Sequence, residues 1–360
     1  MEQYKEITAR FDIRGEVKEV KPLGNGLIND TLLVTTEGPE DYVLQRINQG
    51  IFRDVDLLQH NIDCVTRHLR KKLAAAGEDD LDRKVLRFVA CKETGKSYWT
   101  DGNSWWRVSV FIKDSFTYET VDPRYSEFAG EAFGRFEALL ADIPDALGET
   151  IPDFHNMELR ARQLRDAVEA DAAGRLSDPG VQAILNEILP FEEEMCKAER
   201  LHREGKLPKR ICHCDTKVNN MLFDADGNIL CVIDLDTVMP SFVFSDFGDF
   251  LRTAANPVAE DSPELEKIDF RMDIFEAFSR GYIRSAASFL TDVERENLPY
   301  AACLFPYMQA VRFFTDYLNG DTYYKIKYPG HNLVRTRNQL ALFRSARAKV
   351  PQMAAYIASL

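Results

Sequence analysis

Hydrophobic positions in the first 112 residues alternate with polar ones over short stretches. Because successive side chains of a strand point to opposite sides, this period of two predicts half-buried β-strands. The predicted strands are Gly15–Leu23, Asp30–Thr35, Tyr42–Ile47, Lys84–Cys91 and Trp105–Ile112. One helix interrupts them, with aliphatic residues at near-helical spacing from Val55 to Ala76, and Gly77 is expected to end it.

From residue 113 onward the hydrophobic period lengthens to that of amphipathic helices. The long helices predicted there are Tyr125–Ala141, Glu158–Ala173, Val181–Arg203, Asp269–Leu290 and Pro299–Leu318. A chain of 360 residues is long enough for two hydrophobic cores. We therefore expect an α+β protein with a small β-rich N-terminal lobe, residues 1–112, and a larger helical C-terminal lobe, residues 113–360.

The segment 211–236, ICHCDTKVNNMLFDADGNILCVIDLD, carries the most informative polar pattern of the chain. Five of its residues have the spacing of a kinase catalytic loop followed by the strand that binds its metal. These residues are His213, Asp215, Lys217, Asn220 and Asp234. The DADGN stretch predicts a turn between two short strands, 221–223 and 229–233, which would return the chain beside its starting point. With this pattern the expected fold becomes a bilobal, protein-kinase-like α+β fold.

Each residue of this set suits a role in phosphoryl transfer. Asp215 would orient or deprotonate an attacking hydroxyl, and Lys217 would neutralise the moving phosphoryl group. Asn220 and Asp234 would hold Mg2+ against the phosphates of ATP. A single aspartate of this kind would more simply cap a loop or end a strand, but the ordered set favours the catalytic interpretation.

The segments HCDTKVNN and VIDLD resemble the catalytic loop and metal strand of the aminoglycoside phosphotransferase and choline kinase superfamily. Five stretches together are similar to the N-acetylhexosamine 1-kinases of that superfamily. They are GNGLINDTLLV (24–34), YVLQRIN (42–48), DTKVNN (215–220), IDLDTVMP (233–240) and RFFTDYLNGDTYY (312–324). The resemblance implies an ATP-dependent kinase that phosphorylates the anomeric hydroxyl of N-acetylglucosamine or N-acetylgalactosamine. Its product would be a sugar 1-phosphate, formed without a phosphoenzyme.

The N-terminal lobe contains the candidate nucleotide-binding residues. We expect Gly24 and Gly26 to let backbone N–H groups approach the ATP phosphates, although a plain hairpin turn would use the same glycines. Arg46 occupies the position where most kinases carry a strand lysine, and the resemblance favours phosphate binding there over a surface salt bridge. The glutamate that usually pairs with that lysine is absent from the following helix. Three aspartates could replace it: Asp54, Asp56 and Asp63.

The candidate acceptor residues lie further along the chain. Asp236, two residues beyond Asp234, would hold a substrate hydroxyl or a second Mg2+, or would only cap a loop. Segment 312–324 combines aromatic faces, which cover the C–H patches of a sugar, with charged groups that orient hydroxyls. The resemblance implies that Arg312 and Tyr323 contact the sugar, whereas the phenylalanines there belong in the core.

Three further polar residues have expected structural roles. Asp246 and Asp249, in SDFGDF, resemble the acidic position that braces the catalytic loop in this superfamily. The DFG string follows the metal strand and is therefore not the metal motif of protein kinases. His331 is expected to be structural.

Composition and charge limit the classes of partner. A net charge of −13 argues against binding nucleic acid or anionic membranes, because either needs a positive field. The N-terminus lacks an apolar signal core, and no stretch approaches the ~20 apolar residues of a membrane span, so we expect a cytoplasmic protein. The seven cysteines include no CxxC pair and are expected to be reduced. A zinc site at Cys212, His213 and Cys214 would lack a second ligand pair.

Several alternatives remain open on the sequence. Another kinase acceptor is homoserine, choline, methylthioribose or an aminoglycoside. A metal-dependent phosphoesterase could use Asp215, Asp234 and Asp236 to hold two ions, but no histidines cluster with them. A non-catalytic nucleotide-binding regulator would explain the missing strand lysine, whereas the intact set of Asp215, Asn220 and Asp234 opposes it. The oligomeric state is not predicted.

Overall fold

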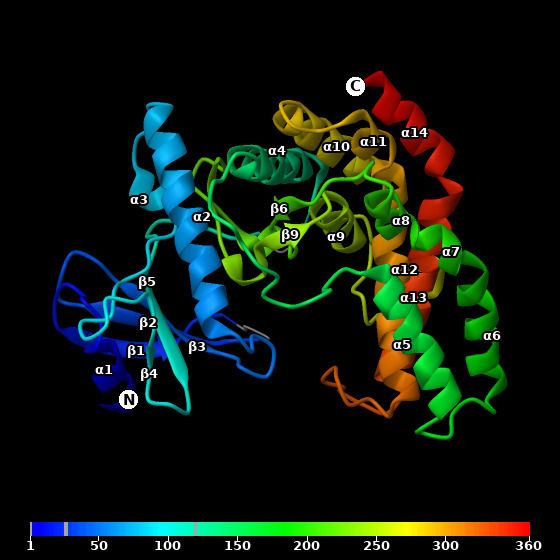
Figure 1. Ribbon diagram of the computed structural model, residues 1–360, viewed down its shortest axis with the longest axis horizontal. Helices are drawn as coiled ribbons and strands as arrows, with labels where there is room; N and C mark the ends of the chain where they lie inside the picture. The colour runs from blue at the N-terminus through cyan, green and yellow to red at the C-terminus, as the bar shows by residue number, and fades with distance from the viewer. Residues whose placement is uncertain (1, 25–27, 119–120) are drawn as a thin grey trace. The chain divides into compact units, whose positions relative to one another are not determined.

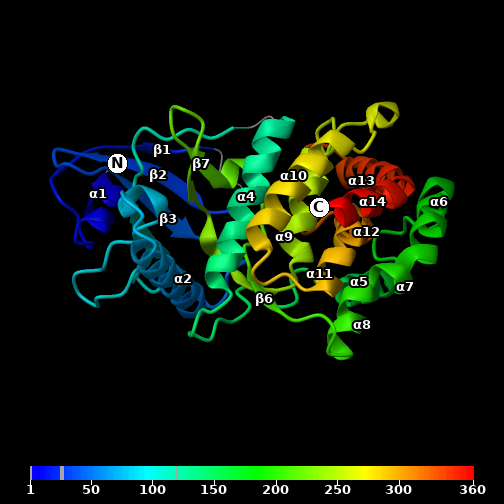
Figure 2. The ribbon, with the colours of Figure 1, turned by 90° about the horizontal axis from the view of Figure 1, so that it is seen from above.

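The computed structural model describes residues 2–24, 28–118 and 121–360, and its chain forms two compact units (Figures 1 and 2). The first unit comprises Met1–Thr117, Leu139–Pro152 and Asn220–Met239. The second comprises Tyr118–Ala138, Asp153–Asn219 and Pro240–Leu360. The units are thus interleaved along the chain, and the segment after the predicted catalytic loop folds with the N-terminal residues. The assignment of separate functions to residues 1–112 and 113–360 stays a prediction.

A five-stranded antiparallel sheet forms the centre of the first unit, in the order β1-β2-β3-β5-β4 (Figure 1). The strands are β1 (Val17–Pro22), β2 (Asp30–Thr36), β3 (Tyr42–Ile47), β4 (Trp99–Thr100) and β5 (Trp105–Val110). The helices of this part are α1 (Glu2–Thr8), α2 (Val55–Ala75) and α3 (Leu81–Lys84). Apolar side chains on one face of the sheet pack with α1, as Leu44, Trp106 and Ile7 show.

The opposite face of the sheet is polar where it meets α2. Strand register pairs Gln45 with Arg107 and Arg46 with Trp106. Since adjacent residues of a strand point to opposite faces, Gln45 and Arg107 lie on the α2 side, and Arg46 lies on the side of the apolar core. Arg107 donates from Nη1 to Oε1 of Gln59 on α2, at 3.3 Å, which confirms the side it faces.

The predicted hairpin of the metal strand is confirmed. Strands β7 (Met221–Phe223) and β8 (Ile229–Val232) pair in antiparallel fashion. The side chain of Asp224 closes the turn by accepting from the backbone N–H groups of Asp226 and Asn228, at 2.9 and 2.8 Å. Two short 3-10 helices flank the hairpin, η2 (Val218–Asn220) and η3 (Leu235–Thr237).

The second unit is largely helical. Its helices are α4 (Pro123–Leu140), α5 (Met157–Ala170), α6 (Pro179–Ile188), α7 (Glu192–Met195), α8 (Lys197–Arg203), α9 (Phe244–Ala254), α10 (Met272–Ala286), α11 (Asp292–Glu296), α12 (Leu298–Leu318), α13 (His331–Ala348) and α14 (Val350–Ser359). The last two residues of α4, Leu139 and Leu140, are counted with the first unit. Two further 3-10 turns are η1 (Leu189–Phe191) and η4 (Leu265–Lys267). A short strand β6 (Arg210–Cys212) pairs with β9 (Met239–Ser241). Helix α12 is buried on nearly all sides and is flanked by α5, α9 and α13 (Figure 2).

Two predicted elements are wrong. The helix expected over Val181–Arg203 is broken at η1, because Pro190 cannot continue the hydrogen-bond ladder of a helix. The strand expected over Lys84–Cys91 is absent, since α3 ends at Lys84 and the following residues contact β5 and Phe11 only through isolated bridges. Instead, β4 pairs with that side of β5. The α+β fold with a β-rich N-terminal part and a helical C-terminal part is confirmed. No helix in the described part of the chain has the length and apolarity to cross a bilayer.

Two glycines let α4 and α10 cross in direct backbone contact. A Cβ atom at Gly130 would lie 2.1 Å from the carbonyl oxygen of Phe278, and one at Gly281 would lie 2.1 Å from that of Glu127. We expect Gly130→Ala to destabilise the protein by about 1–3 kcal/mol, because the backbones must separate. Urea unfolding measures the change. Arg124→Ala, at an exposed site on the same helix, is the control, and equal unfolding midpoints for the two variants would contradict the close approach.

Candidate functional site

The loop that contains Asp215 is held by one buried carboxylate. Oδ2 of Asp246, on α9, accepts from the backbone N–H of His213 at 2.7 Å, and Oδ1 accepts from that of Cys214 at 2.7 Å. The hydroxyl of Thr216 donates to the carbonyl oxygen of Asp246 at 2.7 Å. These bonds hold the residues on both sides of Asp215, so the predicted bracing role of Asp246 is confirmed.

The backbone of this loop is strained at Cys214, which has φ +63°. Left-handed geometry at a non-glycine residue persists only where its surroundings enforce it, as the Asp246 carboxylate does here. His213 is buried between Phe133 and Phe136, with ring centroids 5.6 and 5.8 Å away. The histidine of the motif therefore anchors the loop in the core.

A second buried carboxyl group supports Asp246. Burial, and then the neighbouring Asp246, raise the pKa of Glu137 well above its ordinary value, so Glu137 keeps its proton and hydrogen-bonds to Asp246. The hydroxyl of Tyr282 donates to Oε2 of Glu137 at 2.6 Å. Glu137, Asp246 and Cys212 have ligand atoms close enough to surround a metal ion. However, burial raises the pKa of the Cys212 thiol, which disfavours a metal there.

Asp215 and Lys217 form an ion pair within this loop, with Nζ 2.7 Å from Oδ1. Burial alone would lower the pKa of Lys217, but the charges of Asp215 and Asp249 outweigh it and raise that pKa. Lys217 is therefore fully protonated at neutral pH. The pair supplies a carboxylate that can accept a hydroxyl proton and, two residues away, a cation for phosphoryl oxygens.

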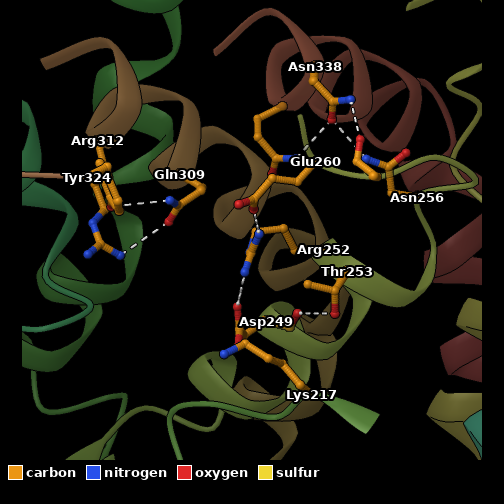
Figure 3. Close-up of polar contacts among 12 residues, drawn as sticks. Lys217, Asp249, Arg252, Thr253, Asn256, Glu260, Gln309, Arg312, Tyr324 and Asn338 are labelled. Atoms are coloured by element: carbon orange, nitrogen blue, oxygen red, sulfur yellow. Dashed lines mark hydrogen bonds and ion pairs between the residues drawn. The ribbon is translucent and has the colours of Figure 1, made fainter. Parts of the chain in front are cut away.

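Within the second unit, a chain of charges continues beyond Lys217 (Figure 3). Nε of Arg252 donates to Oδ1 of Asp249 at 3.1 Å, and its Nη1 donates to Glu260 at 2.7 Å. Burial favours the protonated form of Asp249, but Arg252 and Lys217 hold its pKa below the ordinary value. Asp249 is thus a fixed negative charge behind the catalytic-loop lysine.

The first unit brings the two predicted metal ligands together. The N–H of Ile233 donates to the carbonyl oxygen of Asn220 at 2.9 Å, so Asp234 follows directly where the hairpin returns to Asn220. Asp234 has φ 60° and ψ 56°, a left-handed conformation that turns the chain after β8. An amide and a carboxylate offer the oxygen ligands that Mg2+ prefers, so the two side chains suit that ion.

Asp236 lies in a buried polar network of the first unit. Its Oδ1 is 2.5 Å from Nη1 of Arg107, and both side chains are almost completely buried. Its Oδ2 accepts from Nδ2 of Asn29 at 2.6 Å, while Oδ1 of Asn29 accepts from the N–H of Asn48. Nε of Arg107 donates to Gln45 at 2.9 Å. The network joins the segment after the metal strand to residues that follow the glycine turn and β3.

Arg107 was not predicted, although the sequence contained a signal. In WWRVSV the alternation puts Trp106 and Val108 on the apolar face and the arginine on the other face of the same central strand. A charge there must be paired if it is buried. The Asp236 carboxylate is thus engaged with Arg107 and Asn29, and its substrate, second-metal and loop-capping roles stay predictions.

The structure describes two of the three predicted nucleotide-binding residues, Gly24 and Arg46. Gly24 has φ +68° at the end of β1, where a turn requires it, and Gly26 lies outside the described residues. Arg46 is half exposed and pairs with Asp30 across β2 and β3, at 2.8 Å. Arg46 lies on the opposite face of the sheet from Arg107. Of the two roles considered for Arg46, phosphate binding and a surface salt bridge, this position favours the salt bridge. Of the three aspartates considered as its partners, Asp54 caps α2, and the other two bind Lys96 and Ser97.

Two of the three predicted acceptor residues, Arg312 and Tyr323, lie in the second unit. Nη1 of Arg312 donates to Gln309 at 3.2 Å, and the side-chain amide of Gln309 donates to the hydroxyl of Tyr324 at 3.2 Å (Figure 3). Tyr323 is 66% exposed. The buried carboxylate of Asp316 accepts from three consecutive backbone N–H groups, those of Thr322, Tyr323 and Tyr324. His331, expected to be structural, is buried, and its Nδ1 accepts from the backbone N–H of Lys327 at 3.2 Å.

Comparison with known proteins decides the family. Residues 19–296 match the model of the phosphotransferase enzyme family. The chain belongs to this family. Its phosphotransferase fold is also found in an aminoglycoside phosphotransferase from Alicyclobacillus acidocaldarius subsp. acidocaldarius DSM 446, at 14% identity and a TM-score of 0.66, covering 99% of this chain and 96% of that one.

Two further phosphotransferases of known structure share the fold. An amicoumacin kinase in complex with AMP-PNP, Ca2+ and Ami matches 94% of this chain and 96% of its own, at 16% identity and a TM-score of 0.58. An ethanolamine kinase from Plasmodium vivax covers 91% of this chain and 84% of its own, at 15% identity and a TM-score of 0.56. At these identities the likeness concerns the fold. The family match makes the chain a small-molecule phosphotransferase of the aminoglycoside phosphotransferase and choline kinase type.

The buried pair of Arg107 and Asp236 generates a stability prediction. Arg107→Met should destabilise the protein by about 3–5 kcal/mol, because it leaves an uncompensated buried carboxylate. Adding Asp236→Asn should recover much of this loss, since the remaining charge is then removed. Urea unfolding of both single variants and the double variant measures the coupling.

Arg87→Met is the control for this pair. Arg87 also forms an ion pair in the first unit, with Glu40, but its side chain is 33% exposed. Loss of such a pair should change stability by about 1 kcal/mol or less. A strictly additive double variant, or an Arg107→Met change no larger than that of the control, would contradict the role assigned to the buried pair.

Proposed function

We propose that this phosphotransferase transfers the γ-phosphate of ATP to the anomeric hydroxyl of an N-acetylhexosamine, N-acetylglucosamine or N-acetylgalactosamine. The observation that carries the proposal is the Asp215–Lys217 ion pair on a loop fixed from both sides by Asp246. A carboxylate and a lysine held at this spacing suit the transfer of a phosphoryl group to a hydroxyl. The product would be a sugar 1-phosphate.

Each loop residue has a defined part in the proposed reaction. Asp215 accepts or orients the acceptor O–H, and much of its effect comes from positioning, because the proton leaves late in a loose transition state. Lys217 stays protonated and stabilises charge on the transferred group. Asn220 and Asp234 would hold Mg2+, which would offset the phosphate charge of bound ATP. Transfer is direct, with the acceptor hydroxyl as the nucleophile.

Support for ATP as donor comes from the family match and from the amicoumacin kinase, whose structure contains AMP-PNP and Ca2+. Gly24 and Gly26 are the proposed phosphate-facing turn. Arg46 stays a candidate phosphate ligand, although its pairing with Asp30 means that ATP would have to compete for it. Asn29, which follows these glycines in the sequence, donates to Asp236, two residues after Asp234.

Support for a sugar acceptor comes from the motif resemblance and from the second unit. Arg312 lies among aromatic rings, with its guanidinium carbon 5.5 Å from the centre of Phe154 and 5.7 Å from that of Tyr324. Tyr323 presents an exposed aromatic face on a loop that Asp316 holds in place. Such a combination of aromatic faces and a fixed hydrogen-bond donor suits a polyhydroxylated ring. Asp236 is a third candidate, and its carboxylate also pairs with Arg107.

The test of this proposal is ADP release with Mg·ATP across free sugars, amino alcohols and aminoglycosides, followed by phosphorus NMR of the product. We expect ADP with N-acetylglucosamine or N-acetylgalactosamine and the signal of an anomeric phosphate. ADP formed only with an amino alcohol or an aminoglycoside would keep the phosphotransferase and reject the sugar. Inorganic phosphate in the absence of any acceptor would favour a phosphoesterase.

Asp215→Asn tests the catalytic assignment. The variant should lose turnover by a factor of roughly 10²–10⁴ or more, because the amide cannot accept the hydroxyl proton, while ATP should still bind. Asp226→Asn is the matched control, since Asp226 is an exposed residue of the β7–β8 turn. Steady-state kinetics and ATP titration of the two variants measure the difference. Near-normal turnover of Asp215→Asn would exclude Asp215 as the proton acceptor.

A further inference from the structure

Arg107 of β5 is a buried cation that the proposed reaction does not use. Only 3% of its side chain is exposed, and Nη1 lies 2.5 Å from Oδ1 of Asp236. The same guanidinium donates to Oε1 of Gln45 at 2.9 Å and to Oε1 of Gln59 at 3.3 Å. A buried charge is retained only where it is paired and hydrogen-bonded in this way. Because protein atoms cover Arg107, any effect of this residue on the reaction passes through its partners.

The chain around Asp236 is held from several sides. Asp236 lies in η3, and its Oδ2 accepts from Nδ2 of Asn29 at 2.6 Å. Its carbonyl oxygen accepts from the hydroxyl of Thr150 at 2.9 Å. Two residues later, the carbonyl oxygen of Val238 accepts from Nδ2 of Asn61, on α2, at 3.0 Å. These bonds tie η3 to α2, to the segment before β2 and to the segment after α4.

Asp234, the proposed Mg2+ ligand, lies between two anchored stretches of chain. On one side, the N–H of Ile233 donates to the carbonyl oxygen of Asn220 at 2.9 Å, so the β7–β8 hairpin fixes the chain before Asp234. On the other side, Asp236 pairs with Arg107. Asp234 itself has φ 60° and ψ 56°, and a non-glycine residue keeps this left-handed backbone only where its surroundings enforce it. Arg107 is thus one of the residues that hold the backbone beside the metal ligand.

The network also includes residues that follow the proposed phosphate-facing turn in the sequence. Asn29 is buried, and its Oδ1 accepts from the N–H of Asn48 at 2.9 Å. Nδ2 of Asn48 donates to the carbonyl oxygen of Ile28 at 3.2 Å. The carboxylate of Asp236 therefore joins Arg107 of β5 to the stretch that leads into β2.

We propose that Arg107 is a positioning residue for the metal–nucleotide complex. Through Asp236 it fixes the backbone of the metal ligand Asp234 and thereby strengthens the binding of Mg·ATP. This inference rests on the donor side of the proposed function, ATP with Mg2+ at Asn220 and Asp234, and does not depend on the acceptor. Residues that orient metal ligands from outside the coordination shell contribute to metal affinity, because a ligand that moves must be ordered again when the ion binds.

The experiment is calorimetric titration of the protein with ATP, once with Mg2+ and once with EDTA in place of the metal. The wild type should bind Mg·ATP more tightly than ATP alone. Arg107→Met should weaken the binding of Mg·ATP by roughly 10- to 100-fold and that of metal-free ATP by less than roughly three-fold. A purely stabilising role would not produce this difference, since unfolded protein lowers the number of binding sites and leaves the ratio of the two affinities unchanged.

Two further variants separate positioning from stability. Arg107→Lys keeps the charge beside Asp236 but loses the planar fork that also reaches both glutamines, so it should lose less Mg·ATP affinity than Arg107→Met. Asn29→Ala leaves the buried ion pair in place and should weaken the binding of Mg·ATP by roughly ten-fold. Because both residues act through Asp236, the Arg107→Met/Asn29→Ala double variant should lose less than the product of the two single losses. Asn29→Ala also carries the test if Arg107→Met does not fold.

Val34→Ala is the control for lost stability. Val34 is fully buried in the apolar core on the other face of the same sheet, so its truncation destabilises the first unit without touching the network. This variant should bind Mg·ATP and metal-free ATP as the wild type does. Equal weakening of both forms of ATP by Arg107→Met and Asn29→Ala would overturn the inference, and so would a selective loss of Mg·ATP affinity in Val34→Ala.

The wild type and the variants test different statements. A wild type that binds no Mg·ATP, or binds it no better than ATP alone, would reject the donor of the proposed function and the inference with it. Tight Mg·ATP binding by the wild type and by both network variants would leave the function standing and reject the inference alone.

Discussion

The hydrogen bonds of Asp246 are the constraint on which the conformation of the loop around Asp215 depends. Both oxygens of this buried carboxylate accept backbone N–H groups, at His213 and Cys214, and its own carbonyl oxygen accepts from Thr216. Asp215 lies between these held residues. Its backbone is therefore fixed, while its own side chain pairs with Lys217. Glu137, protonated and bonded to Asp246, keeps a second negative charge out of the interior. The loop can therefore hold the left-handed backbone of Cys214.

A different buried charge organises the first unit. In many kinases a strand lysine and a helix glutamate cross the space beside the phosphates. Here glutamines stand on β3 and α2, at Gln45 and Gln59, and the cation between them is Arg107 of β5. Arg107 turns to Asp236, just after the metal strand. As in those kinases, one cation pairs with one carboxylate. Here the cation comes from β5 and the carboxylate from the segment after β8.

Local patterns predicted much of this structure because the physical cause was local. The alternation in β2, β3 and β5, the DADGN turn and the motif from His213 to Asp234 were readable in order, and Asp246 followed from its place after that motif. The long-range parts were not readable. Arg46 and Arg107 are both strand arginines, and only the register between β3 and β5 shows that they face opposite sides. The contact of Asn29 with Asp236 likewise joins residues 207 positions apart in the chain.

The most direct test of the central claim follows the γ-phosphorus of ATP itself. The account holds that Asp215, fixed by the loop, directs an acceptor hydroxyl onto that phosphorus and is not itself phosphorylated. ATP made chiral at the γ-phosphorus should yield an acceptor phosphate of inverted configuration, as a single in-line displacement requires. Retention of configuration would show two displacements and a phosphoenzyme, and chirality recovered only in inorganic phosphate would show hydrolysis. Either result would contradict direct transfer to an acceptor.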